Sequence, residues 1–171
     1  MEGFNEFSVK NLEENTFRLF DDEWTLITAG NIHSFNTMTA SWGGMGILWN
    51  KPIAICFIRP QRFTYQFAER SSFFTLSFFD EEFRKILDYC GSRSGREYDK
   101  IKETGLIPVT TGTGNITYQQ ARLVFECRKL YSDHLKESNF IDKGLIYRNY
   151  PAKDFHRFYI GEIEYCYQKL K

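Results

Sequence analysis

A short segment carries two arginines and a threonine at a spacing that suits an anion. Arg59-Pro60-Gln61-Arg62-Phe63-Thr64 follows an apolar run, and the pattern predicts that a strand ends here and a short helix begins near Arg62. Free backbone N–H groups at a helix start favour negative charge, and guanidinium groups donate in pairs to phosphate oxygens. Arg59, Arg62 and Thr64 are therefore candidates for holding a phosphate. A solvated pair of surface arginines is the alternative explanation of the same residues.

The segment from Asn36 to Trp42 places small polar side chains along one predicted strand. Strand alternation puts hydroxyls on one face and apolar side chains on the other: Thr37, Thr39 and Ser41 against Met38 and Ala40. Such a row is typical of an ordinary exposed sheet face. It would equally allow the backbone and hydroxyls to meet a flat ring with alternating donors and acceptors. Trp42 would then border the ring, or else lie in the core.

The remaining reactive side chains form no recognisable catalytic or metal-binding pattern. The histidines are scattered, and none pairs with a serine or cysteine in a catalytic order: His33, His134 and His156. The four cysteines lack Cys-x-x-Cys spacing, so we expect buried thiols and no zinc site. Two glycine-rich pieces, Gly43–Gly46 and Gly112–Gly114, lack the further residues of a nucleotide-binding loop. We therefore expect neither a metal nor a catalytic side chain.

Composition narrows the class of protein. The chain has 171 residues, 22 basic and 22 acidic, which suggests one domain over residues 1–171 and argues against a nucleic-acid partner held by a basic face. Aromatic residues make up 18%, a bias that fits β-structure. The first residues lack a basic region followed by an apolar one, and no stretch is long enough to span a membrane. We expect a cytoplasmic protein with no membrane partner.

Alternation and turn residues predict mostly strands. The expected strands are residues 23–30, 35–41, 53–58, 73–79, 106–111, 116–130 and 155–170, the last bulged near Gly161. Residues 43–46 are expected to break the pattern, 50–52 to form a turn, and 132–144 to be irregular. Residues 1–22 are expected to form an arm or a short edge element.

Three short helices complete the prediction. One covers residues 63–70, and another covers 99–104 and is closed by Gly105. The best defined follows Asp80 as N-cap, because four apolar side chains fall on one helical face: Phe83, Ile86, Leu87 and Cys90. Six or seven strands with only short helices favour a mainly β fold, an antiparallel sheet that closes as a barrel.

Four segments, in order, resemble the flavin reductase-like, FMN-binding split-barrel family, especially its flavoredoxin-like branch. They are Asn36–Trp42, Pro52 before an apolar strand together with Arg59–Tyr65, Ser94-Gly95-Arg96-Glu97-Tyr98-Asp99-Lys100, and His156 through Ile163. The resemblance implies a six-stranded antiparallel split barrel of Greek-key type that acts as a homodimer. It implies FMN lying along Asn36, Thr37, Met38, Thr39, Ala40, Ser41 and Trp42, its phosphate on Arg59, Arg62 and Thr64, with Ser94, Gly95 and Lys100 approaching from a loop and His156 walling the substrate pocket.

The same resemblance implies a function. Hydride would pass from NADH or NADPH to flavin N5, and the reduced flavin would pass electrons to a small-molecule or protein acceptor. Two alternatives stay open: an FMN electron carrier without a nicotinamide pocket, and a flavin-free split-barrel binding module. The chain departs from the family after Trp42, where Gly43-Gly44-Met45-Gly46 is followed by bulky side chains. That departure leaves the identity of the acceptor open.

Overall fold

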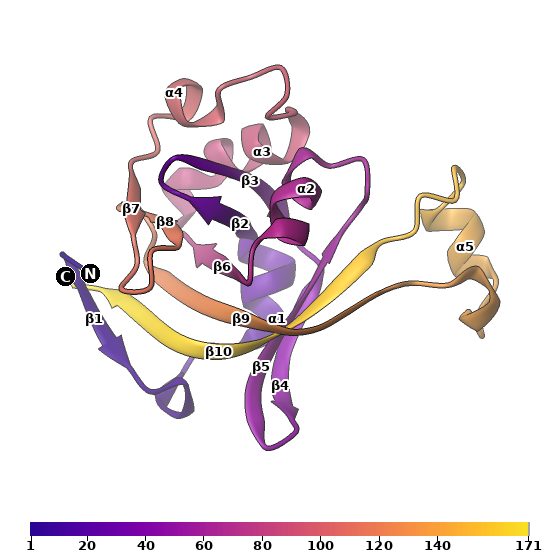
Figure 1. The fold of residues 1–171 in the computed structure, drawn as a ribbon, viewed down its shortest axis with the longest axis horizontal. Helices are drawn as coiled ribbons and strands as arrows, with labels where there is room; N and C mark the ends of the chain where they lie inside the picture. The colour runs from indigo at the N-terminus through magenta and orange to yellow at the C-terminus, as the bar shows by residue number, and fades with distance from the viewer. Residues whose placement is uncertain (171) are drawn as a thin grey trace.

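A computed structural model describes residues 1–170 and consists mainly of strands (Figure 1). The strands are β1 (Phe4–Phe7), β2 (Thr25–Asn31), β3 (Ser34–Ala40), β4 (Gly43–Leu48), β5 (Lys51–Ile58), β6 (Phe73–Phe78), β7 (Pro108–Thr110), β8 (Ile116–Tyr118), β9 (Leu123–His134) and β10 (Arg157–Lys169). The helices are η1 (Val9–Asn11), α1 (Thr16–Arg18), η2 (Leu19–Glu23), α2 (Phe63–Arg70), η3 (Glu81–Phe83), α3 (Arg84–Ser92), α4 (Lys100–Thr104), η4 (Glu137–Asn139) and α5 (Gly144–Asn149). None of the described helices is long and apolar enough to cross a membrane.

One antiparallel sheet forms the body of the molecule. Its strand order is β3-β2-β6-β9-β10-β5-β4, and β1 pairs with the end of β10. The two edge strands, β3 and β4, are linked through only Ser41 and Trp42, and no ladder joins them within residues 1–170. The curved sheet is therefore split at this point. The mainly β prediction is confirmed, whereas the predicted six or seven strands are too few, because β1, β4 and β8 are strands of their own.

Glycines 43–46 do not break the sheet but begin β4. A side chain at Gly43 would lie 2.3 Å from the ring of Phe20 and 2.8 Å from the carbonyl oxygen of Ile55, so glycine permits close packing at this edge. The turn comes later, at Trp49 and Asn50, which both have positive φ. The prediction of a break at residues 43–46 is wrong. Glycine is needed at position 43 because the ring of Phe20, more than twenty residues upstream, packs against the strand there, and not because the chain turns.

Three further boundaries differ from the predictions. The expected strand 116–130 is interrupted by a turn between β8 and β9, closed by a hydrogen bond from the Ala121 amide to Tyr118. Residues 132–144 are not wholly irregular, because β9 continues to His134 and η4 follows it. Asp80 precedes η3 but makes no side-chain cap; its carboxylate lies 3.9 Å from Arg122 instead. The predicted helices over 63–70 and 99–104 are confirmed, and Asp99 caps the latter.

Aromatic side chains fill the core between the sheet and the helices. Phe78 contacts Phe20 and Phe125 edge to face, with ring centroids 5.7 and 5.8 Å apart. All four cysteines are buried free thiols, as expected. The predicted bulge in β10 is confirmed, since the register shifts at Gly161, where a Cβ would lie 2.7 Å from the Phe74 ring.

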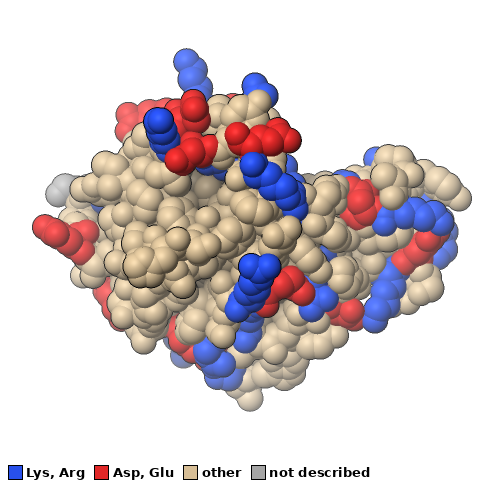
Figure 2. Space-filling model, turned by 45° about the horizontal axis from the view of Figure 1, so that its top comes forward, with Lys and Arg blue, Asp and Glu red and all other residues tan. Residues whose placement is uncertain are grey.

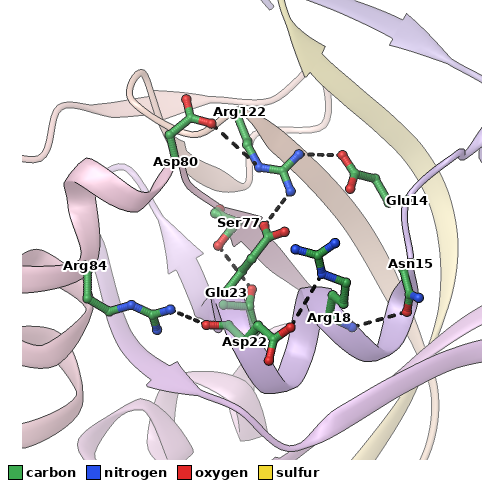
Figure 3. Close-up of polar contacts among 10 residues, drawn as sticks. Glu14, Asn15, Arg18, Asp22, Glu23, Ser77, Asp80, Arg84 and Arg122 are labelled. Carbon is green, nitrogen blue, oxygen red and sulfur yellow. Dashed lines mark hydrogen bonds and ion pairs between the residues drawn. The ribbon is translucent and has the colours of Figure 1, made fainter.

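An arginine on the turn before β9 clamps the N-terminal segment to the barrel. Arg122 donates to the carboxylates of Glu14, which precedes α1, and Glu23, the last residue of η2, and Figure 3 shows both at its guanidinium group. The side chain of Arg122 is largely buried, at 21% exposure. These ion pairs hold the segment that carries Phe17 and Phe20 against the open edge of the sheet.

We expect Arg122→Ala to lower the free energy of unfolding by about 1–2 kcal/mol, because two partly buried carboxylates lose their counter-ion. Urea titration followed by tryptophan fluorescence measures the change. Arg18→Ala is the matched control, since the Arg18–Asp22 pair is exposed on both sides and should contribute less than about 0.5 kcal/mol. Equal effects of the two substitutions would contradict the clamp.

An arm projects from the far ends of β9 and β10 (Figure 1). It comprises residues 135–156 with η4 and α5, and Figure 2 shows side chains of both charges on it. Its inner part packs back on the barrel, because the His156 ring lies 5.2 Å from the Trp42 ring and 6.3 Å from the Phe57 ring, measured between centroids. The arm thus brings residues distant in sequence to the end of β3.

Candidate functional site

Strand β3 is an open edge whose two faces are already covered. The Thr37 hydroxyl is 3.0 Å from the Thr28 hydroxyl and donates to the Ile27 carbonyl, and the Thr39 hydroxyl donates to Leu87 in α3. Met38 lies in the core on the other face. The hydroxyl row is therefore not an exposed sheet face, and it is largely engaged inside the protein. What β3 leaves for a ligand is its backbone edge, which pairs with no strand on that side within residues 1–170 and on which the Thr37 carbonyl accepts from Lys100.

A small cavity of about 90 Å³ lies beside the start of β3. Five of the predicted site residues line it: Arg62, Thr64, Ser94, Gly95 and Lys100. Asn36 joins their segments, because its Nδ2 donates to the Thr64 hydroxyl at 2.7 Å. The loop that carries Ser94 and Gly95 also lies against Asn36, because a Cβ on Gly95 would fall 2.0 Å from the Asn36 Oδ1. Sequence positions 36, 62–64 and 94–100 are thus brought together at one point.

Three cations line this cavity, Arg62, Arg93 and Lys100, and two of them, Arg62 and Lys100, donate to backbone carbonyl oxygens around it. Arg62 donates to the carbonyl oxygens of Gly91 and Cys90, at 2.7 and 3.4 Å. Lys100, 5% exposed, donates to the carbonyl oxygens of Thr37 and Cys90, at 2.8 and 2.7 Å. Within residues 1–170 no carboxylate lies within 4.0 Å of either cation. A bound anion would supply the missing countercharge.

Burial shifts the pKa of both groups. It lowers the pKa of Arg62, and it lowers the pKa of Lys100 to about 8, with the neighbouring Arg62 charge acting in the same direction. Desolvated cations without counter-ions are unfavourable in a folded chain. Such groups are typical of sites that take up an anionic ligand.

Arg59 faces a different part of the chain. Its guanidinium pairs with Asp154, donates to the Asn149 carbonyl at 2.8 Å, and lies over the Tyr150 ring at 5.2 Å. The structure therefore does not bring Arg59 together with Arg62, and only Arg62 lines the small cavity. The assignment of Arg59 to a phosphate stays a prediction.

The other end of β3 opens into an aromatic hollow of about 580 Å³. Ser41 and Trp42 line it, with aromatic side chains from α1, η2, β5 and the arm: Phe17, Phe20, Phe57 and Tyr150. His156 lies behind Trp42, with ring centroids 5.2 Å apart, and its Nδ1 is 2.8 Å from the Tyr150 hydroxyl. Burial lowers the pKa of His156 to about 4, so the imidazole is neutral at pH 7.

Sequence reasoning missed the contribution of the arm. Tyr150 and Asp154 belong to a polar segment without helical or strand periodicity, so nothing in their spacing connects them with Trp42 or Arg59. Ala40 packs against the core and Ser41 is half-buried at the rim of the aromatic hollow. The predicted residues thus form two groups at the two ends of one edge strand, one cationic and one aromatic.

The comparisons with known proteins agree with this architecture. The model of the family described as "Flavin reductase like domain" matches residues 17–170. None of the curated proteins compared with the chain matches it.

Several solved structures have a similar fold at low sequence identity. An FMN-binding protein from Thermus thermophilus, with bound 1-cyclohex-2-enone, has a TM-score of 0.67 and 18% identity over 96% of this chain and 80% of that one. A flavoredoxin from Methanosarcina acetivorans has a TM-score of 0.66 and 21% identity, over 86% of this chain and 68% of that one. An FMN-binding domain of a flavin reductases-like enzyme from Shewanella baltica has a TM-score of 0.69 and 15% identity, over 97% of this chain and 77% of that one.

Proposed function

We propose, from the premise that this chain belongs to the flavin reductase like domain family, that it binds FMN and acts as a NAD(P)H:flavin oxidoreductase. Family membership supports a flavin-related redox function. The observation that carries the finer proposal is a pair of cations beside the Thr64 and Ser94 hydroxyls: half-buried Arg62 and buried Lys100, which have no carboxylate partner among residues 1–170. A terminal phosphate monoester offers the charge and the acceptor oxygens that this cavity needs.

The residues present fit FMN along β3. Arg62, Lys100, Thr64 and Ser94 would hold the phosphate, and Gly95 lets the loop approach it. The edge from Asn36 to Ser41 would run beside the ribityl chain and the ring, ending at Trp42. When bound, FMN supplies the ring that accepts hydride from NADH or NADPH.

The side chains around the aromatic hollow would position and shield that ring. Trp42, Phe57 and Tyr150 provide flat apolar surface and exclude water. Neutral His156 is held by Tyr150 and presents no positive charge to the hollow. Hydride transfer needs no side chain that acts as an acid or a base. The protein contributes by binding and orienting the flavin and the nicotinamide.

The assembly and the acceptor are part of the same proposal. We propose a cytoplasmic homodimer that passes electrons from the flavin to a small molecule or a protein. Size-exclusion chromatography with light scattering tests the dimer.

Steady-state turnover tests the reductase activity directly. With catalytic protein, excess FMN and NADH or NADPH, we expect continuous nicotinamide oxidation, followed at its near-ultraviolet absorption band. Nicotinamide that stays unoxidised, in protein that binds FMN and accepts electrons from a reduced protein partner, would instead identify an electron carrier.

Lys100 makes FMN binding depend on pH. Its pKa of about 8 in the free protein means that its charge is lost as the pH rises through 8, whereas a phosphate monoester, with its second pKa near 6, is already a dianion. We expect FMN affinity to fall about tenfold between pH 7 and pH 9. Fluorescence titrations at both pH values measure this. Riboflavin, which lacks the phosphate, should show no such decrease, and a parallel decrease for both flavins would contradict the assignment.

A further inference from the structure

The hairpin formed by β7 and β8 packs against strands β2 and β6 of the main sheet (Figure 1). All three residues of β8 are buried. The turn of the hairpin is fixed as well, because the buried carboxylate of Glu126 in β9 accepts from the Thr111 hydroxyl and from the Asn115 amide, both at 2.6 Å. The hairpin therefore presents β8 to the sheet from a fixed position.

Hydroxyl groups meet in the layer between β8 and the sheet. The Ser77 hydroxyl in β6 lies 2.9 Å from the Thr117 hydroxyl in β8. The Thr28 hydroxyl in β2 lies 3.2 Å from the Tyr118 hydroxyl, also in β8. All four side chains are buried. Because buried hydroxyls need hydrogen-bond partners, each of these contacts fixes β8 against one strand of the sheet.

The contact at Thr28 continues to the edge strand β3. Thr28 and Thr37 are cross-strand neighbours of β2 and β3. The Thr28 hydroxyl donates to the Thr37 hydroxyl at 3.0 Å, which in turn donates to the Ile27 carbonyl at 3.3 Å. Since a hydroxyl carries one proton, the Tyr118 hydroxyl is the donor to Thr28. These groups form one hydroxyl chain, from Tyr118 to the Ile27 carbonyl, in which every hydrogen bond runs the same way and polarises the next.

The residue that this hydroxyl chain holds, Thr37, also supports the small cavity. Its carbonyl accepts from the Lys100 ammonium at 2.8 Å and from the Asn36 amide at 3.2 Å. Lys100 lines the small cavity, and the Asn36 amide also donates to the Thr64 hydroxyl there. A displacement of Thr37 would therefore move the Lys100 ammonium away from its place in the cavity.

We propose that Thr28 and Tyr118 are positioning residues, which hold the Thr37 carbonyl where it directs the Lys100 ammonium to the phosphate of a bound flavin. The inference rests on the proposed function, because the phosphate is the ligand group that Lys100 would meet. The Thr28 and Tyr118 side chains are buried inside the protein, so they act through Thr37 and not by touching the flavin.

Fluorescence titrations of the full chain with FMN and with riboflavin, which lacks the phosphate, test the proposal. We expect Thr28→Val to lower FMN affinity by about three- to tenfold, the effect of losing one hydrogen bond, and to change riboflavin affinity by less than about twofold. In a Lys100→Gln chain the same substitution should change FMN affinity by less than about twofold, because the positioned ammonium is absent. Thr28→Ser keeps the hydroxyl and should bind FMN as the wild type does.

Ser77→Ala is the matched control, because it removes a buried hydroxyl from the same layer but not from the hydroxyl chain that reaches Thr37. Thermal unfolding should show lower stability for Ser77→Ala and for Thr28→Val, whereas only Thr28→Val should reduce the preference for FMN over riboflavin. Tyr118→Phe is the milder variant, since it removes one oxygen and keeps the ring that packs on Phe79. We expect it to lower FMN affinity by about two- to threefold.

Two results would leave Thr28 and Tyr118 with a structural role alone and overturn the inference. One is an equal loss of FMN and riboflavin affinity in Thr28→Val, and the other is a loss of FMN affinity that persists in the Lys100→Gln chain. A wild-type chain that binds no FMN would overturn the proposed function and this inference with it. FMN binding that depends on Lys100 but is unchanged by Thr28→Val and Tyr118→Phe would overturn this inference alone.

Discussion

Replacing Arg62 and Lys100 together by glutamine is expected to weaken FMN binding by about 100-fold or more, while riboflavin binding changes little. Each side chain would lose a charge-assisted hydrogen bond to phosphate, at about 1.5–3 kcal/mol apiece. Neither cation is neutralised by a carboxylate within the described chain, so the phosphate is the partner that gives each one its charge compensation. Titration of flavin fluorescence measures both affinities.

Two controls sharpen that experiment. Arg70→Gln with Lys85→Gln removes one arginine and one lysine from exposed positions and should leave FMN affinity unchanged. Arg59→Gln tests the one predicted phosphate contact that the structure separates from the others, and we expect a smaller loss because Asp154 already pairs with it. An equal loss of FMN and riboflavin affinity in the Arg62 and Lys100 variant would show that these residues hold the fold of the edge rather than the phosphate.

Gly95→Ala is expected to lower FMN affinity by roughly 5- to 150-fold, which corresponds to about 1–3 kcal/mol of overpacking. The new Cβ would lie 2.0 Å from the Asn36 Oδ1 and 3.1 Å from the Phe63 ring, so the loop or the Asn36 amide must move. Either movement disturbs the hydrogen bond from Asn36 to Thr64 and displaces Ser94. The measurement is the same titration, with thermal unfolding to verify the fold.

Gly46→Ala is the matched control for this change. Gly46 lies on the edge strand β4 and a Cβ there meets nothing within 4 Å. FMN affinity should remain within about twofold. If Gly95→Ala bound FMN as well as Gly46→Ala does, the close approach of the loop to β3 would have no role in the site.

The local patterns predicted most of the sheet because they depend on neighbouring residues alone. Alternation identified β3 and β6, and the apolar face formed by Phe83, Ile86, Leu87 and Cys90 identified α3. The failures come from contacts between distant residues. Gly43 is required by the Phe20 ring, and Asp80 is drawn to Arg122 rather than to the helix start. Neither partner can be recognised from the local sequence.

The sequence predicted more of the site at the Asn36 end of β3 than at the Trp42 end. The resemblance placed Asn36, Arg62, Thr64, Ser94, Gly95 and Lys100 in one site, and the structure brings them together; FMN binding by them stays a prediction. The sequence could not reveal that, among the described residues, the Arg62 and Lys100 side chains donate to backbone carbonyls and to no side chain, since every residue has a carbonyl. The pairing of Arg59 with Asp154 and of Tyr150 with His156 depends on how the arm folds back.

The most direct test of the flavin reductase assignment is the visible absorption spectrum of the protein incubated with FMN, freed of unbound flavin and then mixed anaerobically with NADH or NADPH. The account predicts a protein-bound flavin spectrum that bleaches on addition of the nicotinamide. Protein that retains no flavin after incubation with excess FMN would contradict the proposal that this chain binds FMN.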